Sequence, residues 1–292
     1  MAEAVERRVG TLKGFSGSCL SIIRDDHTFV RKHVDNREKM VGEIAKLHHL
    51  SDLCNDGYGA FDVPVVWDEA DESYDLEYIR GFTVEEYLQT CTVDELNDMA
   101  RKFALIVTLM ASQDQEATTA ARDLYLIQCL KEVDGLYDVH AVGSKIASSV
   151  FSKDTFCHGD LTLDNAIVGT DGMVYLIDPL INQHETYMWD VAKVLQSCYA
   201  DWYQIRTAEI GAAKSNQRSQ RLRMFARAFL NNLPPYIDLE VTALYLAVVL
   251  LRIVKHAPLP DQREVLRDRA CVMLSQFMGE REPFNMEDAT WT

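Results

Sequence analysis

The first part of the chain alternates between apolar and polar residues, which is the pattern of half-buried β-strands. Two alternating runs within residues 11–34 flank a polar turn at residues 24–27 and predict an antiparallel hairpin. Residues 62–68 and 73–79 predict two more strands, joined by an acidic turn. Between these pairs, residues 36–50 carry apolar side chains at helical spacing, so we predict one helix there.

The remainder of the chain has mainly helical periodicity. Helical patterns begin at Phe82 and continue over residues 93–110, 121–137, 140–150, 187–197, 218–230, 239–256 and 261–278. The exception is a pair of short apolar runs on either side of residues 169–172, which predicts a second hairpin. We therefore predict an α+β protein with a small N-terminal antiparallel β lobe containing one helix, residues 1–79, and a larger helical lobe, residues 80–292.

Composition narrows the classes of partner. The 292 residues carry a net charge of −16, and such a surface repels phosphate backbones, so we expect no nucleic-acid partner. Seven scattered cysteines without a Cys-x-x-Cys pair indicate a reducing compartment, and we expect a cytoplasmic protein. The longest apolar run, residues 241–254, contains Arg252 and is too short for a membrane span. Residues 1–10 have no apolar core of the kind that a secretory signal needs.

Three polar residues have the spacing that phosphoryl transfer requires. Asp160 and Asn165 lie five positions apart in a loop, and Asp178 follows thirteen positions later at the end of an apolar run. One carboxylate can orient an attacking hydroxyl and accept its proton, while the amide and the other carboxylate hold Mg²⁺ on the phosphates. The alternative is an ordinary turn at Gly159 and Asp160. The second half of the motif arrives where the first half requires it, which favours the catalytic interpretation.

These residues resemble the catalytic loop and the metal-binding strand end of the protein-kinase-like superfamily. His158-Gly159-Asp160 and Asp178-Pro179 stand where protein kinases carry His-Arg-Asp and Asp-Phe-Gly. The chain is therefore more similar to the aminoglycoside phosphotransferase branch, which includes choline, homoserine and sugar kinases. The resemblance implies a bilobal protein-kinase-like fold in which residues 1–79 bind the nucleotide and residues 80–292 carry catalysis and substrate binding.

The resemblance also implies roles for the loop residues. Asp160 would be the catalytic base, and Asn165 and Asp178 would be the metal ligands. His158 would support the loop from behind rather than take part in the chemistry. Asp190 would accept backbone amides of the loop, although a plain helix cap is the competing explanation.

A strand lysine and a helix glutamate complete the nucleotide site in the resembled family. Lys32 has the position of the lysine that contacts the α- and β-phosphates, and its neighbour Arg31 would face the opposite side of the strand. Glu43 matches the glutamate that holds this lysine, and Glu38 remains an alternative.

Two backbone segments are implied to contact the nucleotide. The turn Ser16, Gly17 and Ser18 would cover the phosphates, because glycine lets backbone amides approach closely. Glu77 and Ile79 would bind the adenine edge through backbone groups of the hinge. A plain hairpin turn and a simple edge strand are the respective alternatives.

We therefore predict an ATP- and Mg²⁺-dependent phosphotransferase that acts on a hydroxyl of a small molecule, such as a sugar or an amino alcohol. The alternatives are a catalytically inactive kinase-like nucleotide-binding module or a protein kinase. Only twelve positions separate Asp178 from Asp190, which leaves little platform for a protein substrate. A hydrolase is disfavoured because the chain has no Gly-x-Ser-x-Gly elbow.

Several properties stay open at the level of sequence. The sequence does not distinguish ATP from GTP, does not name the acceptor and does not fix the oligomeric state. Lys193 receives no role. Arg252 is either a helix-end cation, which is the default, or an anion contact for the substrate.

Overall fold

A computed structural model describes residues 7–13, 19–24, 27–56, 59–113, 119–149, 154–182, 184–200 and 212–284. Ser16, Gly17 and Ser18, our candidates for the phosphate-covering turn, lie outside these residues. The chain divides into two compact units, Met1–Val84 with Asp164–Ile181, and Glu85–Leu163 with Asn182–Thr292. The lobe boundary that we place between residues 79 and 80 stays a prediction.

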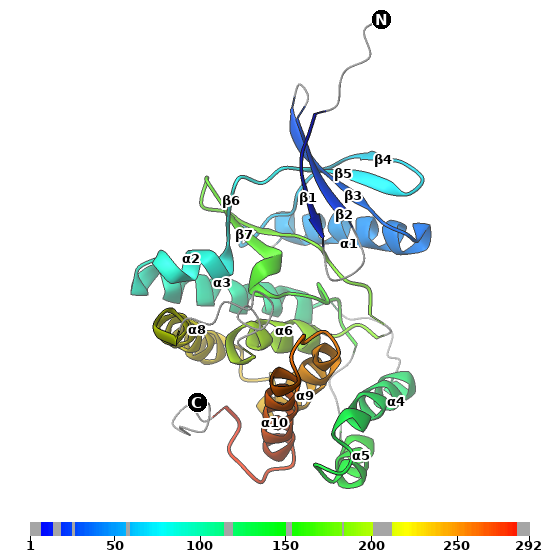
Figure 1. Cartoon of the computed structure of the whole chain (residues 1–292), viewed down its shortest axis with the longest axis vertical. Helices are drawn as coiled ribbons and strands as arrows, with labels where there is room; N and C mark the ends of the chain where they lie inside the picture. Colours follow the sequence, from blue (N-terminus) through cyan, green and yellow to red (C-terminus); the bar gives the residue numbers. More distant parts are fainter. Residues whose placement is uncertain are drawn as a thin grey trace, which may run out of the picture. The chain divides into compact units, whose positions relative to one another are not determined.

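The first unit contains a five-stranded antiparallel sheet with the strand order β1-β2-β3-β5-β4 (Figure 1). Its strands are β1 (Arg7–Lys13), β2 (Cys19–Arg24), β3 (Thr28–His33), β4 (Val66–Glu69) and β5 (Ser73–Glu77). The register pairs Lys32 on β3 with Tyr74 on β5. Because side chains alternate along a strand, Lys32 and Arg31 lie on opposite faces of this sheet.

Helix α1 (Arg37–Asp56) follows β3 and packs its apolar stripe into the core of the first unit. The side-chain oxygen of Asn36 accepts hydrogen bonds from the backbone amides of Glu38, at 2.8 Å, and Lys39, at 3.2 Å. This cap satisfies amides that a helix leaves without partners in its first turn. The buried stripe consists of Met40, Ile44, Leu47, Leu50 and Leu53.

A second, three-stranded antiparallel sheet joins residues that are distant in sequence. Its strands are β6 (Gly81–Thr83), β7 (Ala166–Gly169) and β8 (Val174–Leu176), in that order. We expected helical structure from Phe82, and that expectation is wrong for residues 82 and 83 because they pair with β7. A Cβ atom on Gly81 would lie 2.0 Å from the carbonyl oxygen of Val168, so this pairing requires glycine.

The predicted strand over residues 62–68 is shorter in the structure, where β4 begins at Val66. Asp62 instead bonds to β8: its amide donates to Val174 at 2.7 Å, and its carbonyl accepts from Leu176 at 2.8 Å. Pro64 lies between the two pairings and has no amide hydrogen to continue a ladder.

The second unit is mainly helical. Asp238 caps α9 (Leu239–Val254) by accepting hydrogen bonds from the amides of Glu240 and Val241, and Thr92 forms a capping box with Glu95 at the start of α3 (Val93–Ala111). Helix α9 packs against α6 (Tyr187–Tyr199) and α10 (Pro260–Phe277). The described helices are α2 (Val84–Thr90), α3 (Val93–Ala111), α4 (Thr119–Cys129), α5 (Val139–Ser148), α6 (Tyr187–Tyr199), α8 (Ala212–Asn232), α9 (Leu239–Val254) and α10 (Pro260–Phe277), with a short 3₁₀ turn at Leu130–Val133; a second 3₁₀ turn, Leu163–Asn165, continues into the first unit.

An N-terminal antiparallel sheet with one helix, followed by a mainly helical part, confirms the predicted α+β class (Figure 1). Helix α6 forms the centre of the second unit, since all of its residues are buried. Within the described part of the chain, none of the helices combines the length and the apolar character that crossing a bilayer requires.

Candidate active site

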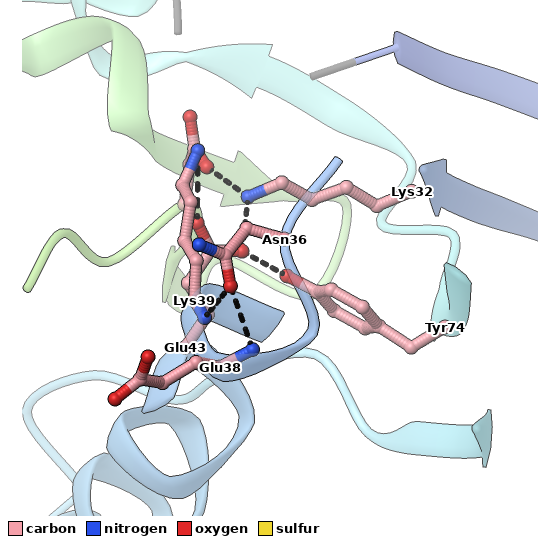
Figure 2. Close-up of polar contacts among 7 residues, drawn as sticks. Lys32, Asn36, Glu38, Lys39, Glu43 and Tyr74 are labelled. Atoms are coloured by element: carbon pink, nitrogen blue, oxygen red, sulfur yellow. Dashed lines mark hydrogen bonds and ion pairs between the residues drawn. The ribbon is translucent and has the colours of Figure 1, made fainter. Parts of the chain in front are cut away.

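Lys32 lies at the centre of a buried polar network in the first unit (Figure 2). Its ammonium group is 2.9 Å from Glu43 Oε2 and also forms an ion pair with Asp178. The hydroxyl of Tyr74 donates to Glu43 Oε2 at 3.0 Å. Lys32 and Glu43 are only 3% and 2% exposed, so water screens their interaction very little.

The charges around Lys32 keep it protonated. Burial by itself would lower the pKa of Lys32, because it disfavours the charged form. The charges of Asp178 and Glu43 act in the opposite direction and outweigh burial, so the pKa of Lys32 lies above its ordinary value. A permanently charged lysine between two carboxylates is the state that a phosphate contact requires.

The structure places the alternatives to Lys32 and Glu43 elsewhere. Arg31 forms a bidentate contact with Asp75, at 2.8 and 2.9 Å, on the other face of the sheet. Figure 2 shows the carboxylate of Glu38 directed away from Lys32. The other cation near Glu43 is Lys39, whose ammonium group is 3.6 Å from Glu43 Oε1.

Asn165 and Asp178 lie next to each other because β7 and β8 form a hairpin. The register pairs Ala166 with Leu176, and the amide of Ile177 donates to the carbonyl of Asn165 at 3.0 Å. Asp178 then adopts φ 57°, a left-handed conformation that is uncommon for residues other than glycine. Its side chain is 40% exposed.

These two residues fit a magnesium ion. An amide oxygen and a carboxylate are hard oxygen donors, and Mg²⁺ commonly takes only one or two protein ligands while phosphate oxygens and water complete its octahedron. Asn165 and Asp178 are therefore candidates in this unit for holding the metal. Their role as ligands stays a prediction.

In the second unit, Asp190 fixes the backbone of the loop that leads to Asp160. Its two carboxylate oxygens accept hydrogen bonds from the amides of His158, at 2.7 Å, and Gly159, at 2.8 Å, and it is fully buried. The cap of α6 is Thr186, whose hydroxyl accepts from Met188, so Asp190 is not the helix cap. Gly159 has φ 86°, which explains why glycine follows the histidine.

His158 is also fully buried, and its Nδ1 accepts a hydrogen bond from the amide of Asp160 at 3.3 Å. The imidazole thereby supports the loop from behind, and this contact involves a backbone group rather than a reacting group. The arrangement is compatible with the supporting role that we predict for it.

Asp160, the predicted base, forms an ion pair with Lys193, at 2.8 Å between Nζ and Oδ1. Burial works to raise the pKa of Asp160, but the charge and hydrogen bond of Lys193, together with the charge of Arg252, outweigh it and hold the pKa below its usual value. The carboxylate is therefore ionised at neutral pH, as an acceptor of a proton must be. Its side chain remains 28% exposed.

Sequence reasoning assigned no role to Lys193. A signal was present in the sequence, because Lys193 follows Asp190 by three positions on one helix, and residues so spaced share a face. Once Asp190 is expected to bind the loop before Asp160, Lys193 is expected on the same side of α6.

The predicted hinge residues lie at the end of β5, where Glu77 is the last residue, and just beyond it. The amide of Glu77 donates to the carbonyl of Val65 at 2.9 Å, and its side chain accepts from the amide of Val65 at 3.3 Å. Ile79 lies two residues beyond the end of β5. Adenine contacts at these two positions stay a prediction.

No family model matches the sequence of the chain, and no curated protein matches it either. Solved structures do match its fold. A putative fructosamine-3-kinase from Thermobifida fusca has a TM-score of 0.54 at 15% identity, over 92% of this chain and 94% of that one. A choline/ethanolamine kinase family protein from Mesorhizobium loti has a TM-score of 0.53 at 14% identity, over 96% and 89%.

A third match is the aminoglycoside phosphotransferase APH(2")-IIa in a ternary complex with streptomycin and ATP, with a TM-score of 0.53 at 10% identity, over 93% of this chain and 94% of that one. The chain thus has the fold of these small-molecule kinases over nearly its whole length, and the predicted resemblance is confirmed at the level of fold. At these identities the likeness establishes the fold alone, and the activity needs its own argument.

Proposed function

We propose that this protein is an ATP- and Mg²⁺-dependent phosphotransferase that phosphorylates a hydroxyl of a small molecule. The observation that carries the proposal is the buried Lys32, in contact with both Glu43 and Asp178. A buried ion network contributes little to stability compared with well-packed apolar side chains. Ionised groups retained at such cost are candidates for a functional site.

The proposed reaction uses this chain's residues in separate roles. The acceptor hydroxyl attacks the γ-phosphorus of ATP, the bond between that phosphorus and the β–γ bridging oxygen breaks, and ADP leaves. Asp160 orients the hydroxyl and accepts its proton, and Lys32 binds the phosphates of the donor. Asn165 and Asp178 would hold the Mg²⁺, which neutralises charge on the phosphates.

The alternative from another class is a nucleotide-binding module without catalysis. An ionised carboxylate at Asp160 with a lysine beside it supports catalysis over that alternative, because a binding module has no need for a proton acceptor. The structures matched by fold include one with ATP and streptomycin bound, which supports a nucleotide donor and a small acceptor here.

The test is transfer of phosphate from ATP to a metabolite extract, followed by mass spectrometry. We expect a mass gain of one phosphate on at least one metabolite with the unmodified protein. Asp160→Ala should abolish the gain while ATP still binds. The control is Asp71→Ala, which removes a carboxylate that is 91% exposed and should leave the transfer unchanged. Absence of any phosphorylated product, together with intact ATP binding, would identify the protein as a binding module.

A further inference from the structure

Arg252 lies in the last turn of α9, against the aromatic rings of Trp189 and Tyr125. Its guanidinium carbon is 5.6 Å from the centroid of Trp189 and 5.9 Å from that of Tyr125. The guanidinium Nη1 is buried, and it has no hydrogen-bond partner among the residues that the structure describes. A buried N–H group without a partner is costly, and in native proteins it calls for a specific explanation.

The helix-end explanation does not account for this geometry. A cation near the end of a helix interacts favourably with the helix dipole, but its buried N–H groups gain partners there only if they donate to the last carbonyl groups. Across the described parts of the chain, neither such a bond nor an ion pair to a carboxylate occurs at Arg252.

Two other cations of the second unit have carboxylate partners, Lys193 and Arg122. Lys193 pairs with Asp160 at 2.8 Å. Arg122 lies 3.1 Å from Asp123 and 4.0 Å from Asp154. Among the described residues of this chain, whose net charge is −16, none of these carboxylates is in hydrogen-bond or ion-pair contact with the Arg252 guanidinium.

Arg252 is also close to the predicted base. The ring on which it lies belongs to Trp189, which directly precedes Asp190, the carboxylate that holds the loop before Asp160. Its charge also contributes to the lowered pKa of Asp160. Arg252 therefore lies within electrostatic reach of the group that would activate the acceptor.

We propose that Arg252 binds an anionic group on the acceptor, a carboxylate or a phosphate monoester, which makes the substrate a hydroxylated small anion. This inference rests on the proposed phosphotransferase function and specifies its substrate class. A guanidinium suits either anion because its planar N–H groups pair with two oxygens at once. The rings of Trp189 and Tyr125 hold the guanidinium plane in place, so little side-chain freedom is lost on binding. The same charge disfavours a cationic acceptor.

The experiment sorts acceptors by charge. A metabolite extract is separated on ion exchangers into anionic, neutral and cationic pools, and each is incubated with the full chain, ATP and Mg²⁺. We expect the product with one added phosphate in the anionic pool. Tandem mass spectrometry of the acceptor then distinguishes a carboxylate from a phosphate monoester. A product only in the neutral or cationic pool leaves the phosphotransferase function standing and overturns the anionic subsite. No product in any pool counts against both.

Variants test the residue itself. With the identified acceptor, Arg252→Met should lower kcat/KM by about 10- to 100-fold, mainly through KM, because one charge-assisted contact is lost. Arg252→Lys should recover part of this loss, since it restores the charge without the planar fork. Arg227→Met, which removes an exposed arginine from α8, is the matched control and should behave as the unmodified protein. An unchanged KM in both Arg252 variants would overturn the assignment.

Discussion

Lys32 and its neighbour Arg31 differ in how deeply their side chains are buried, and this difference predicts how much each contributes to the stability of the fold. Lys32 is 3% exposed and contacts two carboxylates, whereas Arg31, one position earlier, is 28% exposed and forms an ion pair with Asp75. A buried charge that loses its partner has no water to replace it. Substitutions at these adjacent positions should therefore have unequal consequences.

Lys32→Met should lower the free energy of unfolding by about 3–5 kcal/mol, because Glu43 would remain buried without its main counter-charge. It should also abolish measurable ATP affinity. Arg31→Met removes a more exposed pair and should cost about 1 kcal/mol. Urea denaturation and calorimetric titration with ATP measure both effects. Equal losses of stability in the two variants would contradict the assignment of Lys32 to a buried functional network.

Asp160 gives a prediction about pH. Its pKa lies below the usual value because Lys193 and other charges outweigh burial, so protonation inactivates the base only in acid. Activity should therefore persist as pH falls until the lowered pKa is reached. Lys193→Met removes the principal charge that lowers the pKa, so the acid limb of the kcat/KM profile should move to higher pH.

The matched control for this profile is Lys131→Met, at an exposed position of the 3₁₀ turn Leu130–Val133. Its acid limb should coincide with that of the unmodified enzyme. If Lys193→Met also leaves the limb in place, the ion pair with Asp160 does not control the essential protonation.

At the scale of elements, two contacts hold segments in the conformations that the site needs. One is Asp190 at the start of α6, which accepts the amides of His158 and Gly159. The other is the close pairing of β6 with β7 at Gly81, which places no side chain between the strands. For each contact, a substitution that removes or disturbs it can be compared with a control substitution elsewhere in the protein.

Asp190→Asn should destabilise the protein by about 1–3 kcal/mol, since an amide presents only one acceptor where two amides need partners. Hydrogen exchange at His158 and Gly159 should become faster. Thr186→Ala removes the cap of the same helix and should cost about 1 kcal/mol without accelerating exchange at these two amides. Faster exchange in both variants would show that the helix end, rather than Asp190, fixes the loop.

Gly81→Ala should destabilise the protein by about 1–3 kcal/mol, because its Cβ would meet the carbonyl oxygen of Val168 at 2.0 Å. Gly143→Ala, within α5, should instead stabilise by about 0.5–1 kcal/mol, since its Cβ would have ordinary contacts at 3.8 Å and alanine favours helix. Thermal unfolding of the two variants should thus shift in opposite directions. A shift of the same sign would contradict the strand pairing.

At the scale of the whole molecule, sequence periodicity predicted the class of the fold, the hairpin of β7 and β8, and the helix after β3. It failed where long-range pairing decides the local structure. Gly81–Thr83 forms a strand only because β7, some 80 residues later, supplies its partner, and Asp62 bonds to β8 for the same reason.

In the candidate site too, some residues could be predicted from the sequence, whereas others depend on contacts between distant segments. Asp160, Asn165 and Asp178 could be identified from the sequence, because phosphoryl transfer requires these residue types at fixed spacings. Lys193 received no role and Arg252 kept two alternative roles, because their relevance depends on which helix packs beside α6 and on partners that sequence does not reveal. Their roles follow from contacts between segments that are distant in the chain.

The central structural claim is that Lys32, Glu43 and Asp178 belong to a nucleotide site, and the most direct measurement is a calorimetric titration of the full chain with ATP. We expect one ATP to bind per chain, more tightly with Mg²⁺ than with a chelator present. Asp178→Asn should weaken binding by about 10-fold or more in Mg²⁺ and far less in the chelator. The claim is contradicted if ATP does not bind to the unmodified protein. It is also contradicted if the unmodified protein and Asp178→Asn bind ATP with equal affinity, both in Mg²⁺ and in the chelator.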